Sequence, residues 1–273
     1  MGELEGKVAF ITGAARGQGR SHAVGLAAQG VDIIAVDLCR DIDTVSYALA
    51  TAADLEETVR LVEEQGRRIV ASPADVRDMK SLSTGLEEGL KEFGRLDIVL
   101  VNAGIAPESL PEADASEAWA NVIDVNLTGA WNTTRLCKEV LVKGGNGGSI
   151  VITSSTAGLK GISDGTAAGE AYVASKHGVV GLMRALSLEL APHSIRVNTV
   201  HPTGTNTFMV QNPAMQQWIA EHAEVAAAGM QNALPVELIE PSDVTNAILW
   251  LVSDKARYVT GITLPVDAGF TVR

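Results

Sequence analysis

A tyrosine and a lysine four residues apart, Tyr172 and Lys176, have the types and the spacing that suit proton transfer. On a helix this spacing places both side chains on one face. An ammonium beside a phenol favours the phenolate, so it lowers the tyrosine pKa from about 10. A tyrosine of lowered pKa can exchange a proton with an alcohol near neutral pH. The pair alone also fits an ordinary surface helix with a snorkelling lysine.

A glycine-rich turn near the start of the chain supplies a second motif. Gly13, Gly17 and Gly19 form a G-x3-G-x-G pattern that follows an apolar run at 8–11. Such a turn lets the backbone approach a pyrophosphate, and the first amides of the following helix face the phosphates. Glycines also make ordinary turns, so this motif alone is weak. A proton acceptor combined with a nucleotide site indicates hydride transfer on an alcohol or ketone.

Asp37 ends the second apolar run, where its carboxylate can accept hydrogen bonds from a ribose 2′-hydroxyl and repel a 2′-phosphate. This favours NAD over NADP. Arg16 favours the opposite choice, because a cation in the glycine turn could meet a 2′-phosphate. We give Asp37 the greater weight because its position is the more diagnostic. Asp37 could also cap local amides.

Other candidate cofactor contacts follow later apolar runs. Asp75 and Val76 could meet the adenine ring, and the Asn102-Ala-Gly104 turn lets the backbone approach the cofactor ribose. The turn that starts at Pro202 could bind the nicotinamide carboxamide. Each of these could instead be turn chemistry, since Asn and Gly are default turn residues.

The elements that must position these residues alternate along the whole chain. Apolar, Val- and Ile-rich runs are continuous rather than alternating, as in parallel strands covered on both faces. The expected strands are 7–12, 31–37, 68–75, 97–103, 149–154, 195–201 and 262–266. The expected helices are 17–29, 54–66, 78–93, 114–142, 168–191, 213–230 and 241–253. This order predicts an α/β fold: one domain, 1–273, with a doubly wound, Rossmann-type parallel sheet of seven strands.

Composition excludes several classes of function. The chain has 273 residues and a net charge of −12, which argues against nucleic-acid binding. The apolar runs have strand length, so no membrane span is expected, and the start lacks the layout of a secretory signal. Two cysteines are too few for a disulfide framework, and five scattered histidines do not suggest a metal site. We expect a cytoplasmic protein without a bound metal.

Taken in order, these motifs resemble the short-chain dehydrogenase/reductase family over essentially the whole chain. The resemblance implies that Tyr172 is the catalytic acid/base, and that Lys176 binds nicotinamide ribose and lowers the tyrosine pKa. It implies that Ser155 holds the substrate oxygen and that Asn126 supports a proton-relay water. Ser154 is adjacent to Ser155, but Ser155-Thr-Ala-Gly aligns better. The expected cofactor contacts are Gly13, Arg16, Gly17, Gln18, Gly19, Asp37, Leu38, Asp75, Val76, Asn102, Ala103, Gly104, Tyr172, Lys176, Pro202, Gly204, Thr205 and Thr207.

A segment at 39–55 is longer than the alternating pattern needs, and it leaves the edge of the sheet where ligands bind. Together with Val36-Asp-Leu-Cys39 and His201-Pro-Thr-Gly204, it resembles the mycofactocin-associated subgroup, which includes carveol dehydrogenases. This narrower resemblance implies a tightly held NAD covered by the segment. It also implies that electrons pass to the peptide-derived carrier mycofactocin.

Two loops, 156–171 and 203–233, should line the substrate pocket. The second carries Phe208, Met209, Met215, Trp218 and Met230, which suits a compact apolar alcohol or ketone, although the same residues could be core or oligomer packing. An NADPH-linked ketoacyl-type reductase and a non-catalytic nucleotide-binding regulator are the competing readings. Members of the family are commonly tetramers, so we expect a homotetramer.

Overall fold

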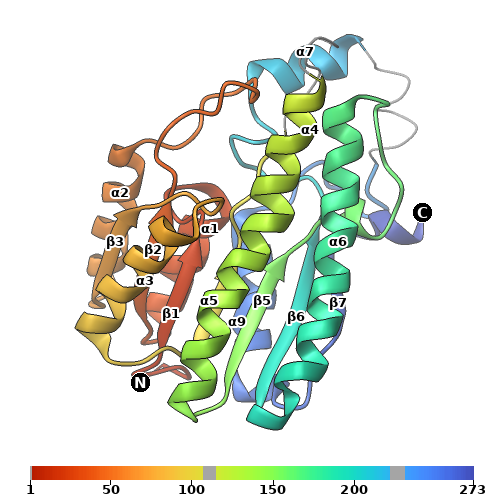
Figure 1. Ribbon diagram of the computed structural model, residues 1–273. Helices are drawn as coiled ribbons and strands as arrows, with labels where there is room; N and C mark the ends of the chain where they lie inside the picture. The colour runs from red at the N-terminus through yellow and green to blue at the C-terminus, as the bar shows by residue number, and fades with distance from the viewer. Residues whose placement is uncertain (1, 107–114, 222–230) are drawn as a thin grey trace.

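Seven strands form one parallel sheet in the computed structural model, which describes residues 2–106, 115–221 and 231–273 (Figure 1). Their order across the sheet is β3-β2-β1-β4-β5-β6-β7, so the chain starts in the middle and winds outward twice. This confirms the predicted fold. The strands are β1 Val8–Thr12, β2 Asp32–Asp37, β3 Ile69–Pro73, β4 Ile98–Val101, β5 Gly148–Thr153, β6 Ile195–Pro202 and β7 Thr263–Val266.

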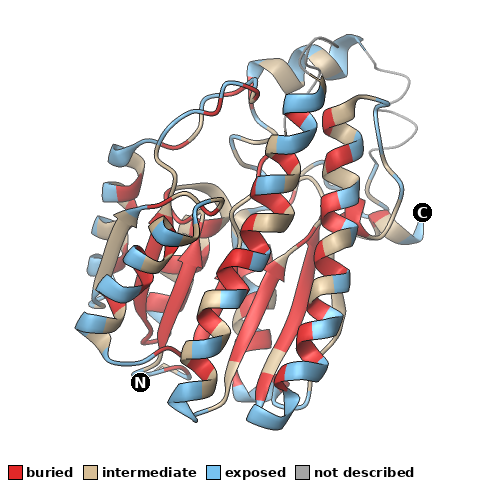
Figure 2. Cartoon of the chain, viewed as in Figure 1, coloured by how far each residue is buried: buried red, intermediate tan, exposed pale blue. Residues whose placement is uncertain are grey.

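Helices cover both faces of this sheet, and two buried apolar layers result (Figure 2). One layer packs α3, α4, α5 and α6 against the sheet, and the other packs α1, α2 and α9. Because both faces are covered, the central strands are apolar on both sides, which explains their continuous apolar sequence. The described α-helices are α1 Gly17–Ala28, α2 Ala52–Glu64, α3 Met79–Phe93, α4 Ala115–Ile123, α5 Gly129–Gly144, α6 Ala167–Leu190, α7 Pro213–Glu221 and α9 Pro241–Val252.

The region 114–142, expected to be one helix, contains a π-helical turn at Asp124–Thr128 between α4 and α5. The wider turn accompanies a buried side chain, Asn126, that hydrogen-bonds across to the backbone after β4. Such turns are frequent at functional sites. The helix expected at 213–230 ends at Glu221, and 222–230, including Met230, lies outside the described residues. In the described part of the chain, no helix is long and apolar enough to span a bilayer.

Candidate active site

Ser155, Tyr172 and Lys176 meet at the carboxyl end of the sheet. Ser155 follows β5, whereas Tyr172 and Lys176 lie on α6 and share the face that the sequence spacing predicts. The Ser155 hydroxyl lies near the Tyr172 phenol, and this contact opposes the rise in the tyrosine pKa that burial causes. The Lys176 Nζ lies 5.5 Å from the centroid of the Tyr172 ring and donates to the Thr153 carbonyl at 3.0 Å. A hydroxyl, a phenol and an ammonium are therefore gathered at one point.

Asn126 approaches this group from the π-helical turn. Its Oδ1 accepts from the Ile105 amide at 2.8 Å, and its Nδ2 donates to the Ile105 carbonyl at 2.9 Å. A Cβ placed on Gly104 would lie 3.3 Å from Asn126 Oδ1 and 3.5 Å from Lys176 Nζ. The Asn102–Gly104 turn thus lies against both side chains, and the absence of a side chain at Gly104 leaves this space open.

The adjacent serines have different partners, which answers the question that the sequence leaves open. Ser154 is buried, and its hydroxyl donates to the Lys176 carbonyl at 2.9 Å. Ser155 is less buried, and its hydroxyl accepts from the Ala157 amide at 3.1 Å while contacting Tyr172. Ser154 therefore ties β5 to α6, and Ser155 is the serine that faces the tyrosine.

Burial changes the proton affinity of both residues of the pair. Burial raises the pKa of Tyr172, and this outweighs the hydrogen bond from Ser155, which lowers it. Burial lowers the pKa of Lys176 to about 8. The expectation that Lys176 lowers the tyrosine pKa is not met by the protein alone, because desolvation disfavours both charged forms. A stable phenolate needs a further positive charge.

A cleft of about 950 Å³, counting its open mouth, lies beside this group. It is lined by most of the residues expected to bind the cofactor: Gly13, Arg16, Gly17, Gln18, Gly19, Asp37, Leu38, Asp75, Val76, Asn102, Ala103, Gly104 and Thr207. Sequence reasoning did not select three residues that also line it, Ala74, Ile105 and Val125, although each adjoins a selected residue. An apolar neighbour carries no signal of its own in the sequence.

The glycine turn fits a dinucleotide. A Cβ on Gly19 would lie 1.9 Å from the Gly13 carbonyl oxygen, and one on Gly13 would lie 2.8 Å from the Ala103 Cα. Gly17 has a positive φ of 55°, a conformation that favours glycine. The Gln18 Oε1 is buried here without a hydrogen-bond partner. The turn therefore leaves backbone accessible at the start of α1, where the phosphates of a nucleotide would lie.

Asp37 lies at the end of β2 inside the cleft. Its two oxygens accept from the Ala15 amide at 2.9 Å and the Cys39 amide at 3.3 Å. Burial raises the pKa of this carboxyl, and the hydrogen bonds from Ala15 and Cys39 oppose the rise. The position fits a ribose-binding carboxylate at the end of the second strand.

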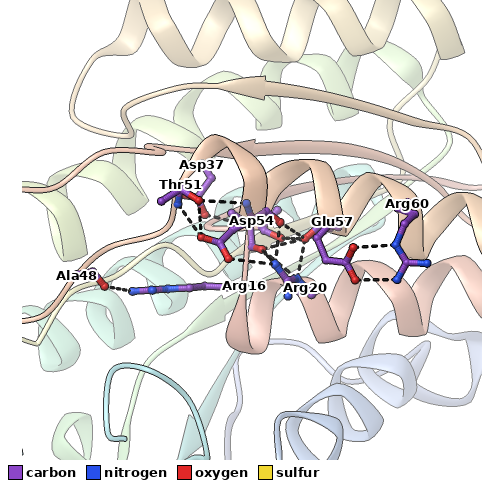
Figure 3. Close-up of polar contacts among 11 residues, drawn as sticks. Arg16, Arg20, Asp37, Ala48, Thr51, Asp54, Glu57 and Arg60 are labelled. Carbon is purple, nitrogen blue, oxygen red and sulfur yellow. Dashed lines mark hydrogen bonds and ion pairs between the residues drawn. The ribbon is translucent and has the colours of Figure 1, made fainter. Parts of the chain in front are cut away.

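Arg16 has partners on two other segments of the fold. Its Nη2 donates to the Ala48 carbonyl at 2.5 Å, as Figure 3 shows, and its guanidinium lies 4.7 Å from the centroid of the Phe208 ring. Arg16 thus joins the segment after β2 to the loop after β6 across the mouth of the cleft. Because these partners engage the guanidinium, the argument that Arg16 favours NADP is weaker.

The turn after β6 contributes less to the cleft than expected. Pro202, Gly204 and Thr205 do not line it, and neither do Tyr172 and Lys176. Thr205 is buried, pairs with Ile239 in a β-bridge and donates to the Thr203 carbonyl. Its polar groups are used within the fold, so Thr207 is the residue of this turn that reaches the cleft.

The segment expected at 39–55 is shorter in the structure, because α2 already begins at Ala52. We call residues 39–51 the cover segment. Ile42 and Tyr47 are buried and, together with Leu49 and Ala50, line the cleft. Thr51 ends the segment with a capping box, in which its hydroxyl accepts from the Asp54 amide and Asp54 accepts from the Thr51 amide.

Polar contacts anchor the cover segment to three other parts of the fold. Besides the bond to Arg16, the Tyr47 hydroxyl accepts from the Ala106 amide at 3.3 Å. Thr44 accepts from Asn121 Nδ2 at 3.0 Å. Asn121 accepts from Arg77 at 2.9 Å, and Arg77 pairs with Asp75 at 2.8 Å. The cover segment is thus attached to the glycine turn, to the end of β4 and, through α4, to the end of β3.

Comparisons with known proteins agree with this geometry. Residues 13–271 match the sequence model of a family described as enoyl-(acyl carrier protein) reductase. A (-)-trans-carveol dehydrogenase of Rhodococcus erythropolis is 48% identical, with 100% of both chains covered. The chain belongs to the short-chain dehydrogenase/reductase family.

Two further members of this family support the assignment. An uncharacterised oxidoreductase of Mycobacterium tuberculosis is 57% identical over 98% of this chain and 97% of its own. The crystal structure of a carveol dehydrogenase from Mycobacterium avium in complex with NAD superposes with a TM-score of 0.93, at 44% identity and with full coverage of both chains. This short-chain dehydrogenase/reductase is therefore an oxidoreductase whose close structural neighbour binds NAD.

Proposed function

We propose that this protein is an NAD-dependent dehydrogenase that interconverts a hydrophobic secondary alcohol, such as a carveol-like terpenoid, and its ketone. The observation that carries the proposal is the meeting of Asn126, Ser155, Tyr172 and Lys176 beside a cleft closed by the cover segment. The carveol dehydrogenase relatives favour a compact cyclic alcohol as substrate. The chain 1–273 then acts as one functional domain in the cytoplasm.

In this proposal each of the four side chains has its own role. Ser155 and Tyr172 hold the alcohol oxygen, and Tyr172 as the phenolate removes the hydroxyl proton. Lys176 holds the nicotinamide ribose, and Asn126 supports the water that relays the proton. Bound NAD supplies the acceptor for the carbinol hydride and a positive ring that stabilises the phenolate. Because the alcohol and the nicotinamide ring are held next to each other, most of the entropic cost of bringing them together is met when they bind.

Asp37 and the glycine turn bind NAD in this proposal, and the cover segment retains it. Leaving would require the buried side chains of Ile42 and Tyr47 to open and the polar anchors of the segment to break, at about 25 cal/mol per Å² of apolar area exposed. Slow dissociation prevents exchange of NADH during turnover, so the electrons need another acceptor. We assign this role to mycofactocin.

An NADPH-linked ketoacyl-type reductase is less consistent with the site. Asp37 lies where a 2′-phosphate would be repelled, and Arg16 is held by Ala48 and Phe208. A non-catalytic nucleotide-binding regulator would not need the complete set of Asn126, Ser155, Tyr172 and Lys176, which this chain retains.

Mass analysis of the small molecules released when the purified protein is denatured tests the proposal. We expect NAD or NADH in near-stoichiometric amount. With carveol, we expect slow turnover on added NAD but turnover with an artificial redox dye, and deletion of 41–53 should restore exchange. Fast, saturable turnover on free NAD would refute retention and the role of mycofactocin while leaving the dehydrogenase assignment intact. Release of NADP would refute the choice of cofactor.

A further inference from the structure

His201 is a buried titratable residue next to the candidate active site that the mechanism above does not use. It lies in β6 and is 0% exposed. Its Nδ1 lies 2.8 Å from the carbonyl oxygen of Ser155, and its Nε2 lies 2.8 Å from the hydroxyl of Thr199. Both ring nitrogens are therefore engaged, one of them by the residue that holds the substrate oxygen.

The hydrogen bonds determine the tautomer of this ring. A carbonyl oxygen only accepts, so the Nδ1 of His201 must carry the proton. In a neutral ring the Nε2 then accepts, and the Thr199 hydroxyl donates to it. Thr199 lies two residues before His201 and so on the same face of β6. Its alternative acceptor, the Ile262 carbonyl, is more distant at 3.4 Å.

The ring is also neutral at physiological pH. The pKa of His201 is lowered to about 4, mainly by burial. Lys176 and His177 on α6 lower it further, while the bond to Ser155 and the charge of Asp267, after β7, raise it. A neutral ring with its proton on Nδ1 is a fixed donor, and it cannot remove a proton from the serine hydroxyl because it faces the carbonyl.

The carbonyl of Ser155 lies just beyond the end of the sheet, so its hydrogen bonds come from outside the β5–β6 ladder, and His201 is one of its two partners. The ladder between β5 and β6 ends with the Ser154 amide, which donates to the Val200 carbonyl at 2.9 Å. Beyond this bond the chain turns into a short 3-10 helix, whose Gly158 amide donates to the Ser155 carbonyl. The bond from His201 therefore replaces the ladder at the residue whose side chain must be aimed at Tyr172.

We propose that His201 is a positioning residue: by holding the Ser155 carbonyl, it aims the Ser155 hydroxyl at Tyr172 and at the substrate oxygen. The proposal rests on the function proposed above. His201, which is far along the chain from Ser155, thus helps to orient the substrate. Thr199 keeps the ring in the required tautomer.

Two substitutions separate positioning from packing. His201→Asn keeps a donor at the position of Nδ1, whereas His201→Leu keeps the volume without a donor. In single-turnover reduction of bound NAD by carveol, we expect His201→Leu to lower the rate about 10- to 100-fold, mainly in kcat rather than KM, because small misplacements at a reacting centre are costly. His201→Asn should recover most of this rate. Equal losses in both variants, or no loss in either, would overturn the proposal.

The pH profile and a double substitution give independent readouts. Tyr172 faces Lys176 on its own helix and Ser155 from the end of β5, and loss of the Ser155 hydrogen bond removes a contribution that lowers its pKa. The rising limb of the rate should therefore move to higher pH in His201→Leu and return in His201→Asn. In a Ser155→Ala background, His201→Leu should cause no further loss. An additive loss there would refute action through Ser155.

Nitrogen NMR of the His201 ring tests the geometry without any activity. We expect a neutral ring protonated at Nδ1 in the wild-type protein, and the opposite tautomer or a charged ring at neutral pH would overturn the proposal. His193→Leu, at an exposed position, is the matched control and should change neither the tautomer nor the rate. If wild-type protein does not oxidise carveol or other secondary alcohols, the proposed function fails, whereas the NMR result still decides the role of the ring.

Discussion

Burial favours the uncharged forms of both Tyr172 and Lys176. The pKa of the phenol is raised and that of the ammonium is lowered to about 8. In the proposed mechanism, Ser155 and the positive charge of the oxidised cofactor therefore stabilise the phenolate. On that mechanism we expect proton removal only in the complex that contains the hydride acceptor.

Tyr172→Phe keeps the ring and removes the proton acceptor. We expect carveol oxidation to fall about 10²- to 10⁴-fold, the usual scale of acid–base catalysis, with NAD still bound. Single-turnover absorbance of NADH measures the first effect, and cofactor released on denaturation measures the second. Tyr258→Phe, at a tyrosine that is 88% exposed, serves as the control. Near-normal activity of Tyr172→Phe would remove this tyrosine from the mechanism.

Asp37→Ser should change the choice of cofactor. The substitution removes an acceptor for the ribose 2′-hydroxyl and the charge that repels a 2′-phosphate. We expect weaker binding of NAD and some gain for NADP, measured as the Kd of each cofactor with refolded, cofactor-free protein. Asp43→Ser, at an exposed position of the cover segment, should leave the preference unchanged. A wild-type preference for NADP would show that the role given to Asp37 is wrong.

At the scale of elements, the cleft is closed by two segments that are far apart in the sequence. The cover segment follows β2 and the loop with Phe208 follows β6, and both lie at the carboxyl end of the sheet (Figure 1). Arg16, at the start of α1, contacts both. Because the strands are parallel, their carboxyl ends share one edge, and loops from distant points meet there.

Arg16→Ala should weaken this closure. The variant loses the hydrogen bond to Ala48 and the contact with Phe208, both at an exposed position, so we expect NAD to dissociate about 3- to 10-fold faster. Dilution of the NADH-loaded protein into excess NAD, followed by fluorescence, measures the rate. Arg60→Ala, on the exposed face of α2, provides a matched loss of charge. An unchanged off-rate in Arg16→Ala would show that this contact does not retain the cofactor.

At the scale of the whole molecule, two buried histidines connect folding to pH. Burial lowers the pKa of His22 to about 3 and that of His201 to about 4, below the ordinary value of 6.5. At a pH between each lowered pKa and about 6.5, that histidine is protonated in the unfolded chain but neutral in the folded one. The stability they contribute is therefore complete above about pH 6.5 and is lost as the pH falls, by up to about 1.4 kcal/mol per pH unit for each histidine.

Denaturant titrations between about pH 7 and about pH 5 measure this slope. His201→Asn should reduce it, because one of the two buried histidines is gone, and the exposed His193→Asn should not. The carboxyls with lowered pKa, such as Asp32 and Asp54, act below about pH 4 and do not contribute in this range. The same slope in His201→Asn and wild type would contradict the assignment of a neutral buried ring.

We also predict a homotetramer. Trp131 on α5 and Leu188 on α6 are 48% and 80% exposed, and Tyr258 near the C-terminal strand is 88% exposed, so large side chains on different elements are available to interfaces. Two self-complementary interfaces build a closed tetramer. Light scattering at micromolar concentration measures the mass, and Trp131→Glu should reduce it to that of a smaller assembly. A monomer for the wild-type protein would contradict the prediction.

The sequence by itself determined the kind and the order of the elements. Continuous Val- and Ile-rich runs predict buried parallel strands, and the 3.6-residue period predicts the helices between them, because burial on both faces selects these patterns. Local spacing also determined that Tyr172 and Lys176 share a helix face. The glycine turn and Asp37 could also be predicted from local sequence. The turn needs glycines at fixed spacing, and Asp37 is recognised by its place at the end of a strand.

Only the tertiary structure decided which groups meet. In the structure, Arg16 contacts Ala48 and Phe208, and Ser154 hydrogen-bonds to the Lys176 carbonyl. Asn126 lies in a π-helical turn, and His201 hydrogen-bonds to the Ser155 carbonyl. These partners come from segments far apart in the chain, and the direction of a side chain between elements depends on how those elements pack. The pattern of residues along a short stretch of sequence does not depend on that packing, so it identifies candidate residues but not their partners.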